Sequence, residues 1–404
     1  MRSHRWSRVL GIVVVSVLTA HVAQGAGFAL YEGSARGNAL GGSVIAQADD
    51  PSAIFYNPAG ITQLEGLQGM AGLTVIKPMS EVVVMTPAGE IATDTEDNYW
   101  LPPHLYGTYQ VNDMVWAGVG LFSRFGLGTE FPSDWPGKYN SYNAEIWTLT
   151  LNPDIALKIN DRVSVAAGVS ATYLDLTLER KLPLTGDPNF KLTGNDIGYG
   201  WNLGVRCEVI DGVAIGASYQ STIQEELDGE ADIQVAKTDA SGGVKLPSIA
   251  SFGVAVQPLE KLSVEVSAVY TGWSTYDQLA ITFDDPMVLG TSESVVEKDW
   301  DDVWRYQVGL EYEMSAEWEL RAGYVYDQSP APDRTADYLL PANDRQLFCL
   351  GCGYKVNNWA FDLSYTYLMI EDRTIEARPM EGIFASEFKD GDTHLVGLSV
   401  STKM

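Results

Sequence analysis

Side chains that alternate between apolar and polar along many separate segments are the feature that most constrains this chain. From Trp304 to Tyr312, every second residue is aromatic or aliphatic, with charged residues, glutamine and glycine between them. Segments within 317–328 and 359–373 repeat the pattern. A period of two residues is the signature of a β-strand whose two faces meet different surroundings. The sequence therefore predicts an all-β fold with many such strands.

The aromatic residues gather near the ends of these segments, whereas a soluble β-sandwich buries mainly aliphatic side chains. Aromatic belts at both ends of strands that are apolar outside and polar inside are typical of a transmembrane β-barrel. In lipid the backbone must satisfy its own hydrogen bonds, and a closed sheet does so without leaving an edge. No apolar stretch of helix-spanning length follows residue 25, which excludes a helical membrane protein. We therefore expect a transmembrane antiparallel β-barrel.

Short turns and long polar connections alternate along the chain, as in outer-membrane barrels with short periplasmic turns and longer external loops. Counting the alternating segments gives about 14 strands, and an even number places both termini on the periplasmic side. The expected wall strands are 66–85, 102–111, 114–124, 145–159, 162–180, 196–210, 213–226, 247–257, 261–283, 301–313, 317–328, 343–356, 359–373 and 392–403.

The N-terminal residues 1–25 have the pattern of a secretory signal peptide. Three arginines precede an apolar run, 9–18, that ends in small residues around Ala23 and Gly25. We expect cleavage before Ala26. The alternative, a helical membrane anchor, is disfavoured because the run is too short to cross a bilayer.

The balance of charge excludes one class of partner. Acidic residues outnumber basic ones by 53 to 26, which gives a formal net charge of −27. Binding to phosphate needs clustered Lys and Arg, so nucleic acid is not expected as a partner.

Residues 26–65 differ from the rest of the chain because frequent glycines interrupt them and no alternation is present. They nevertheless contain apolar side chains that need burial, including Phe28, Ile45 and Phe55. Irregular backbone is tolerated at membrane depth when protein encloses it. We therefore expect an N-terminal plug (hatch), 26–65, in the lumen of a barrel formed by 66–404.

Several pieces of the chain resemble the FadL-type family of outer-membrane transporters for long-chain fatty acids and other hydrophobic compounds. The most specific is an Asn-Pro-Ala triplet, Asn57-Pro58-Ala59, which family members carry in the plug. The other matching pieces are 26–28, 37–46, 50–60, 198–204, 270–276, 320–324, 327–330, 332–334 and 343–345. The resemblance covers nearly all of the mature chain. One departure is the ending, Lys403-Met404, because family barrels usually end in an aromatic residue.

The resemblance implies a fourteen-stranded plugged barrel that transports without chemical conversion. Ligand would be captured at an external groove, passed to a lumenal pocket gated by the N-terminus, and released sideways into the membrane. Such a route suits a fatty acid, since each buried CH₂ group contributes ~0.8 kcal/mol. The alternatives are an aromatic hydrocarbon transporter of the same family and a general diffusion porin for polar solutes, which would need a polar constriction and no plug.

The resemblance also suggests residues for the gate. Phe28 and Leu30 would lie against bound ligand, although Phe28 would equally serve to hold the plug in place. Asn57, Pro58 and Ala59 would form the bend of the plug near the wall opening. A rigid turn without ligand contact is the alternative, because Asn bonds local backbone and Pro fixes φ.

Two further groups of side chains are candidates for ligand contact. An external apolar groove would be formed by Phe122, Phe125, Leu127, Phe131 and Trp135, unless that loop folds on itself. Inward-facing arginines would meet a fatty-acid carboxylate, or would pair with lumenal glutamates instead. These arginines are Arg206, Arg305 and Arg321, and the glutamates are Glu208, Glu311 and Glu319.

An enzyme is the rival from another class, because some barrels carry hydrolase sites. That chemistry needs a nucleophile and a base in reach. Only His104 and His394 follow the signal peptide, and neither has an obvious partner in the sequence. We expect no catalytic residues, metal or cofactor. A structural or adhesive barrel is a third reading. The expected form is a monomer in the bacterial outer membrane, with lipopolysaccharide, membrane lipid and the barrel assembly machinery as partners.

Overall fold

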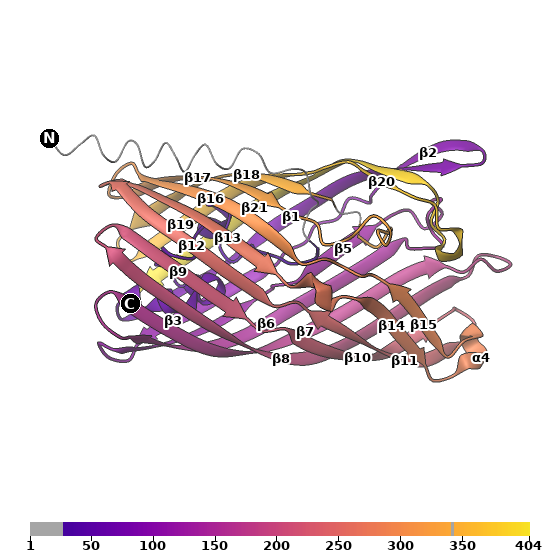
Figure 1. Cartoon of the computed structure of the whole chain (residues 1–404), viewed down its shortest axis with the longest axis horizontal. Helices are drawn as coiled ribbons and strands as arrows, with labels where there is room; N and C mark the ends of the chain where they lie inside the picture. The colour runs from indigo at the N-terminus through magenta and orange to yellow at the C-terminus, as the bar shows by residue number, and fades with distance from the viewer. Residues whose placement is uncertain (1–26, 341–342) are drawn as a thin grey trace.

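The first and last strands of the chain pair with each other, and this pairing closes the sheet. In the computed structural model, which describes residues 27–340 and 343–404, β1 (Leu67–Thr86) is antiparallel to β3 (Pro103–Gln110) and to β21 (Ser386–Lys403). The result is the expected closed barrel of 14 antiparallel strands (Figure 1). The predicted signal peptide lies outside the described residues.

Many wall strands run in two pieces, so the described residues form more strand segments than the barrel has walls. The helices are α2 (Ala35–Ala39), α3 (Ala53–Tyr56), η1 (Pro58–Gln63), η2 (Trp273–Thr275), α4 (Pro286–Leu289) and η3 (Pro379–Glu381). The remaining strands are β2 (Gly89–Asp94), β4 (Val115–Phe122), β5 (Gly126–Glu130), β6 (Asn143–Lys158), β7 (Val163–Lys181), β8 (Asn189–Ile210), β9 (Val213–Gln220), β10 (Ile223–Asp232), β11 (Lys237–Leu246), β12 (Ile249–Leu259), β13 (Leu262–Thr271), β14 (Gln278–Phe283), β15 (Glu293–Glu297), β16 (Val303–Glu313), β17 (Trp318–Asp327), β18 (Arg345–Val356), β19 (Trp359–Ile370) and β20 (Arg373–Ile375).

The two faces of the wall follow the predicted alternation. On β6, Leu151 and Ile155 are exposed, whereas Thr148, Thr150 and Asn152 between and beside them are buried toward the lumen. An outward apolar face meets lipid and an inward polar face encloses the plug, as a membrane barrel requires. Among the described residues, no helix is long and apolar enough to cross a membrane.

Aromatic pairs on the outer face form the predicted belts. The exposed rings of Trp201 and Tyr219 have centroids 5.2 Å apart, and the half-buried rings of Tyr270 and Trp304 lie 5.3 Å apart. Next to the short turn that precedes β17, the exposed ring of Trp318 packs against half-buried Tyr354 of β18, with centroids 4.7 Å apart. Amphipathic aromatic rings on the outer face suit the boundary between lipid and water.

The predicted strand boundaries are wrong toward the long-loop end of the barrel, beyond the aromatic belt on that side (the upper belt). The expected strand 261–283 is interrupted at 272–277, because this segment turns into the lumen and buries Trp273. The long connections expected at 227–246 and 284–300 contain most of the β10–β11 hairpin and β15. The outward residues of β10 are polar, so the sheet continues into water, where the apolar half of the period-two pattern is lost.

Residues 27–66 form the plug and lie inside the barrel near its short-turn end (Figure 1). Ser34 caps α2 by accepting a hydrogen bond from the Gly37 amide, 3.0 Å. Asn57 precedes η1, where Pro58 occupies the first turn, a position that tolerates the missing N–H of proline. Ser34 and Asn57 therefore cap the starts of α2 and η1, while apolar side chains of the plug pack on the wall.

Buried ion pairs join the plug to the wall. The Arg36 guanidinium of α2 binds Glu311 of β16 at 2.8 Å and Asp49 at 2.6 Å. Glu311 also binds Arg321 of β17, 2.6 Å, which in turn pairs with Asp362 of β19 at 2.6 Å. Each charge of this network has a partner, and burial of unpaired charge would be strongly unfavourable.

A single wall carboxylate holds the turn that follows α2. Glu265 of β13 accepts hydrogen bonds from the amides of Ile45, Ala46 and Gln47 at 2.5, 3.0 and 2.8 Å. Glu265 is fully buried, so these amides have exchanged water for one carboxylate.

Substitution Glu265→Ala should loosen the plug. Hydrogen bonds to a charged group contribute about 1.5–3 kcal/mol each, and three are lost together. We expect a higher ion conductance of the purified barrel in a planar bilayer, with its heat-resistant migration on gels preserved. Glu313→Ala, which removes an exposed carboxylate, is the matched control. Equal conductance of the two variants would contradict the role of Glu265.

Candidate functional site

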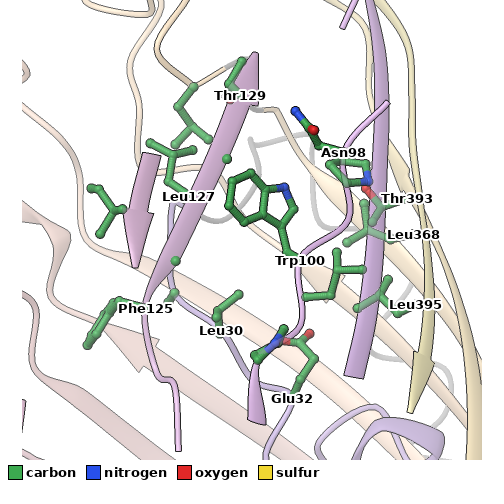
Figure 2. A pocket seen from close by; sticks show the side chains of 18 of the residues that line it. Leu30, Glu32, Asn98, Trp100, Phe125, Leu127, Thr129, Leu368, Thr393 and Leu395 are labelled. Atoms are coloured by element: carbon green, nitrogen blue, oxygen red, sulfur yellow. The ribbon is translucent and has the colours of Figure 1, made fainter. Parts of the chain in front are cut away.

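An apolar cavity of about 420 Å³ lies between the plug and the wall. Leu30 of the plug and Leu127 of β5 enter it from one side, Leu368 and Leu395 enter it from the other, and the Trp100 ring lies between them (Figure 2). Polar side chains lie at its margins, among them Glu32, Asn98, Thr129 and Thr393 (Figure 2). A mostly apolar cavity with a few polar groups is the usual form of a small-molecule site.

The wall breaks beside this cavity, between β4 and β5. The side chain of Thr148 on β6 replaces the backbone as the hydrogen-bond partner there. Its Oγ1 donates to Phe125 O, 2.6 Å, and accepts from the Phe125 amide, 3.1 Å. Ser123 Oγ donates to Thr148 O, 2.7 Å. These bonds hold residues 123–125 out of the regular sheet.

The break leaves an opening, here called the wall gap, between β5 and residues 95–102. Within the described residues, β5 pairs with β6. Its other edge meets residues 95–102 at Glu130, whose carbonyl accepts from the Glu96 amide at 2.8 Å and whose carboxylate accepts from Asn98 Nδ2 at 2.6 Å. The cavity is lined by inward-facing Leu395 and also by outward-facing Trp147, which is 41% exposed. The cavity therefore passes through the wall.

The start of the plug covers the lower edge of the wall gap. The Leu30 amide donates to Arg124 O at 2.7 Å, and the Gly126 amide donates to Phe28 O at 2.9 Å. Residues 28–30 thus form a short strand against the interruption.

Phe28 points away from this strand into an aromatic cluster. Its ring lies 4.6 Å from Trp273, 5.8 Å from Tyr276, 5.8 Å from Trp300 and 6.1 Å from Phe125, measured between ring centroids. Phe28 is 3% exposed and lines a second, smaller cavity of about 30 Å³, which shares Leu127 and other residues with the first. Phe28 therefore lines the smaller cavity, while Leu30 lines the larger one.

The three candidate arginines face inward and have different partners. Arg321 pairs with Glu311, Glu319 and Asp362. Arg206 donates to Ala46 O of the plug at 2.8 Å. Arg305 binds Asp327 at 2.8 Å and lines the large cavity. Among the three, the cavity is therefore in contact with Arg305.

The five residues expected to form one external groove are not brought together. Phe122 packs on Phe55 of the plug, 5.1 Å between centroids. Phe125 joins the Phe28 cluster, and Leu127 lines the large cavity. Phe131 and Trp135 stack on each other at 4.0 Å near the extracellular loops. The break at 123–125 explains this division, because it redirects the chain between Phe122 and Leu127.

Trp135 lines a separate, open groove of about 580 Å³ at the extracellular end. Ile91, Pro132, Tyr139 and Phe384 also line this groove. The lining of this groove is mainly apolar.

Asn57-Pro58-Ala59 lies against β8 and away from both cavities. Asn57 Nδ2 donates to Ile45 O at 2.8 Å and to Val205 O at 3.0 Å, and Asn57 Oδ1 accepts from the Ala59 amide at 3.2 Å. Gly204 gives this turn room, because a methyl group there would overlap Asn57. The contacts are those of a buried rigid turn that joins plug and wall.

Several residues of the site were not predicted from the sequence. Trp100, Glu32 and Arg345 line the large cavity, and Trp273 and Trp300 enclose Phe28. Glu32 carries the carboxyl group of the plug that faces the cavity. Burial raises the pKa of the Glu32 carboxyl above its ordinary value, against the opposing effect of Arg305. The signal available for Trp100 was its place as a large aromatic in a polar connection.

A histidine does have a serine neighbour, which corrects the sequence-based expectation. His104 Nε2 lies 2.9 Å from Ser399 Oγ. Ser399 Oγ already accepts a hydrogen bond from the Ala35 amide, 2.8 Å, and His104 Nδ1 has no partner among the described residues. Both side chains are buried beneath the plug. The pair lacks the third group and the access that a hydrolase needs.

A closed membrane barrel with a lumenal plug and an apolar cavity that passes through its wall defines a class: outer-membrane channels for hydrophobic compounds. The plug is incompatible with the porin alternative, which predicted an unplugged lumen. Residues 16–403 match the family described as outer membrane protein transport protein (OMPP1/FadL/TodX). The chain belongs to this family, which consists of transport channels and not of enzymes, and it is an outer-membrane protein.

Relatives and solved structures agree over almost the full length. The long-chain fatty acid transport protein of Escherichia coli K12 is 25% identical, over 94% of this chain and 95% of that protein. Outer membrane protein P1 of Haemophilus influenzae is 25% identical, over 88% and 89%. The structure of a Pseudomonas aeruginosa FadL homologue has a TM-score of 0.83 at 18% identity, covering 93% and 99%. The Pseudomonas putida toluene transporter TodX has a TM-score of 0.71 at 18% identity, with the same coverage.

Substitution Phe28→Ala should release residues 28–30 from the break in the wall. Truncating a buried Phe costs about 3–5 kcal/mol, which is enough to free a strand held by few hydrogen bonds. We expect faster hydrogen exchange at the Leu30 and Gly126 amides. Phe361→Ala, on the lipid-facing side, should leave both rates unchanged. Slow exchange of these amides in Phe28→Ala would refute the coupling.

Proposed function

We propose that this channel takes up hydrophobic carboxylic acids, with long-chain fatty acids foremost, passively across the outer membrane. The observation that carries the proposal is the large cavity, which joins the lumenal side of Leu395 to the lipid-facing side of Trp147 and contains Arg305. A ligand in this cavity reaches lipid without re-entering water. Returning the tail to water costs ~0.8 kcal/mol for each CH₂ group. A path that keeps the tail in apolar surroundings is therefore strongly favoured for long chains.

Capture takes place in the external groove lined by Trp135 and Phe384. The groove is open and mainly apolar, which suits reversible binding of a tail. Phe131 lies beneath it and stacks on Trp135. Capture in this groove does not depend on the five residues predicted from the sequence lying together.

Residues 28–30 gate the inner site. Ala29 and Leu30 line the large cavity and Phe28 lines the small one. Withdrawal of this short strand would join the two cavities and uncover the edge of β5. Ligand would then leave sideways through the wall gap into the membrane.

Arg305 supplies the contact for a carboxylate head group, together with Arg345. Both guanidinium groups bind the same carboxylate, Asp327, at 2.8 and 3.1 Å. One acid shared between two cations leaves donor capacity toward the cavity, and hydrogen bonds between ions are the stronger kind. Arg206 and Arg321 act in plug attachment and pairing within the lumen.

An aromatic hydrocarbon such as toluene is the alternative ligand within the family. The apolar lining would accept it, and TodX, whose fold is similar, is named as a toluene transporter. The arginines favour the acid, because a hydrocarbon offers them no acceptor. Palmitate and toluene uptake, compared in cells that lack other such channels, distinguishes the two ligands.

Deletion of residues 27–34 tests the gate. The deletion removes Leu30 from the cavity and the short strand from the break, so palmitate uptake at limiting concentration should fall several-fold. Heat-resistant migration of the barrel should persist, because the wall pairs are untouched. Uptake at the wild-type rate would exclude the gating role of Phe28 and Leu30.

Arg305→Gln tests the head-group contact. We expect palmitate to bind the purified barrel about tenfold more weakly, as for the loss of one hydrogen bond to a charged group. Calorimetric or tryptophan-quenching titration measures this. Arg162→Gln, which alters an exposed arginine at a short turn, is the control. Equal affinity of both variants would remove Arg305 from the site.

A further inference from the structure

The backbone of Trp100 is fixed at the edge of the wall gap. Its amide donates to Ile76 O and its carbonyl accepts from the Ile76 amide, each at 2.9 Å. This isolated bridge extends the pairing of β1 beyond the start of β3. We therefore expect the side chain of Trp100, and not its backbone, to move.

The Trp100 ring crosses the wall gap and lies against Gly128 of β5. A methyl group on Gly128 would overlap the ring, so a glycine is required for this contact. Figure 2 shows the indole between β5 and the side chains of Leu368 and Leu395. The ring therefore occupies the passage that a ligand uses to cross the wall.

The indole N–H of Trp100 is buried and has no acceptor among the described residues. The Nε–H of Arg345 is likewise buried without an acceptor among the described residues, and Arg345 lines the same cavity. A passing molecule with an oxygen acceptor gives these groups a partner. A hydrocarbon leaves these donors unpaired, which is unfavourable for a buried N–H.

We infer that Trp100 is a specificity-determining residue of the wall gap, where its indole N–H selects amphiphiles with an oxygen-bearing head group over hydrocarbons. The inference rests on the proposed uptake function and assigns the selective step within it. The ring obstructs the passage, and a head group that accepts the hydrogen bond stabilises the ligand beside it. Ligands are therefore discriminated at the wall gap as well as at the arginines that line the cavity.

Trp100→Phe removes the N–H and keeps an aromatic ring. Uptake of radiolabelled palmitate and hexadecane, which have equal chain lengths, is measured in cells that produce the full chain and lack other such channels. Palmitate uptake at limiting concentration should fall about tenfold, with hexadecane uptake unchanged. Trp318→Phe, on the lipid-facing surface, should change neither.

Gly128→Ala tests the same contact from the opposite side. The added methyl group displaces the ring from the gap, so hexadecane uptake should rise and the preference for palmitate should fall. A palmitate-to-hexadecane ratio that neither variant changes overturns the inference, as does an equal loss of both probes in Trp100→Phe. If the wild-type chain takes up palmitate, those results leave the proposed function standing. Failure of the wild-type chain to take up either probe overturns both.

Discussion

The absence of water inside a bilayer is the constraint on which this structure depends. Every backbone N–H and C=O at that depth needs a protein partner, and the β1–β21 ladder meets the requirement by closing the sheet. Closure creates a lumen, and the irregular plug becomes possible because the wall encloses it. The break at 123–125 is tolerated for the same reason, since Thr148 and the plug residues Phe28 and Leu30 supply the bonds that a wall neighbour would have made.

The repeated strands were predictable because lipid outside and polar groups inside impose a period of two along each strand. The alternation on β16, β17 and β19 led to the correct barrel, and the lack of it in 26–65 identified the plug. Prediction failed above the upper belt, where water lies outside the wall. There the outward face of β10 becomes polar, and the strands were mistaken for loops. The inward turn of 272–277 left no pattern, because burial of Trp273 depends on distant Phe28.

The candidate site was predictable in part, and the reason lies in how it is built. Phe28 and Leu30 were suggested by the resemblance of the plug segment to the FadL-type family, and Arg305 by its inward-facing position on a regular strand. Trp100 meets Gly128 only through the fold, across residues that do not pair regularly. Glu32 and Arg345 come from opposite ends of the chain. Side chains assembled by a broken wall lack a shared sequence pattern, so their meeting had to be seen in three dimensions.

The bonds between plug and wall also bear on the order of folding. The plug is tied to β8 through Asn57, to β13 through Glu265, to β16 through Arg36 and to β21 through the Ala35 amide. These strands extend over more than half of the barrel circumference and include the last one made. A segment held on so many sides is more readily surrounded than inserted. The N-terminal residues, synthesised first, would then act as a template around which the later hairpins assemble before β1 and β21 pair to close the barrel.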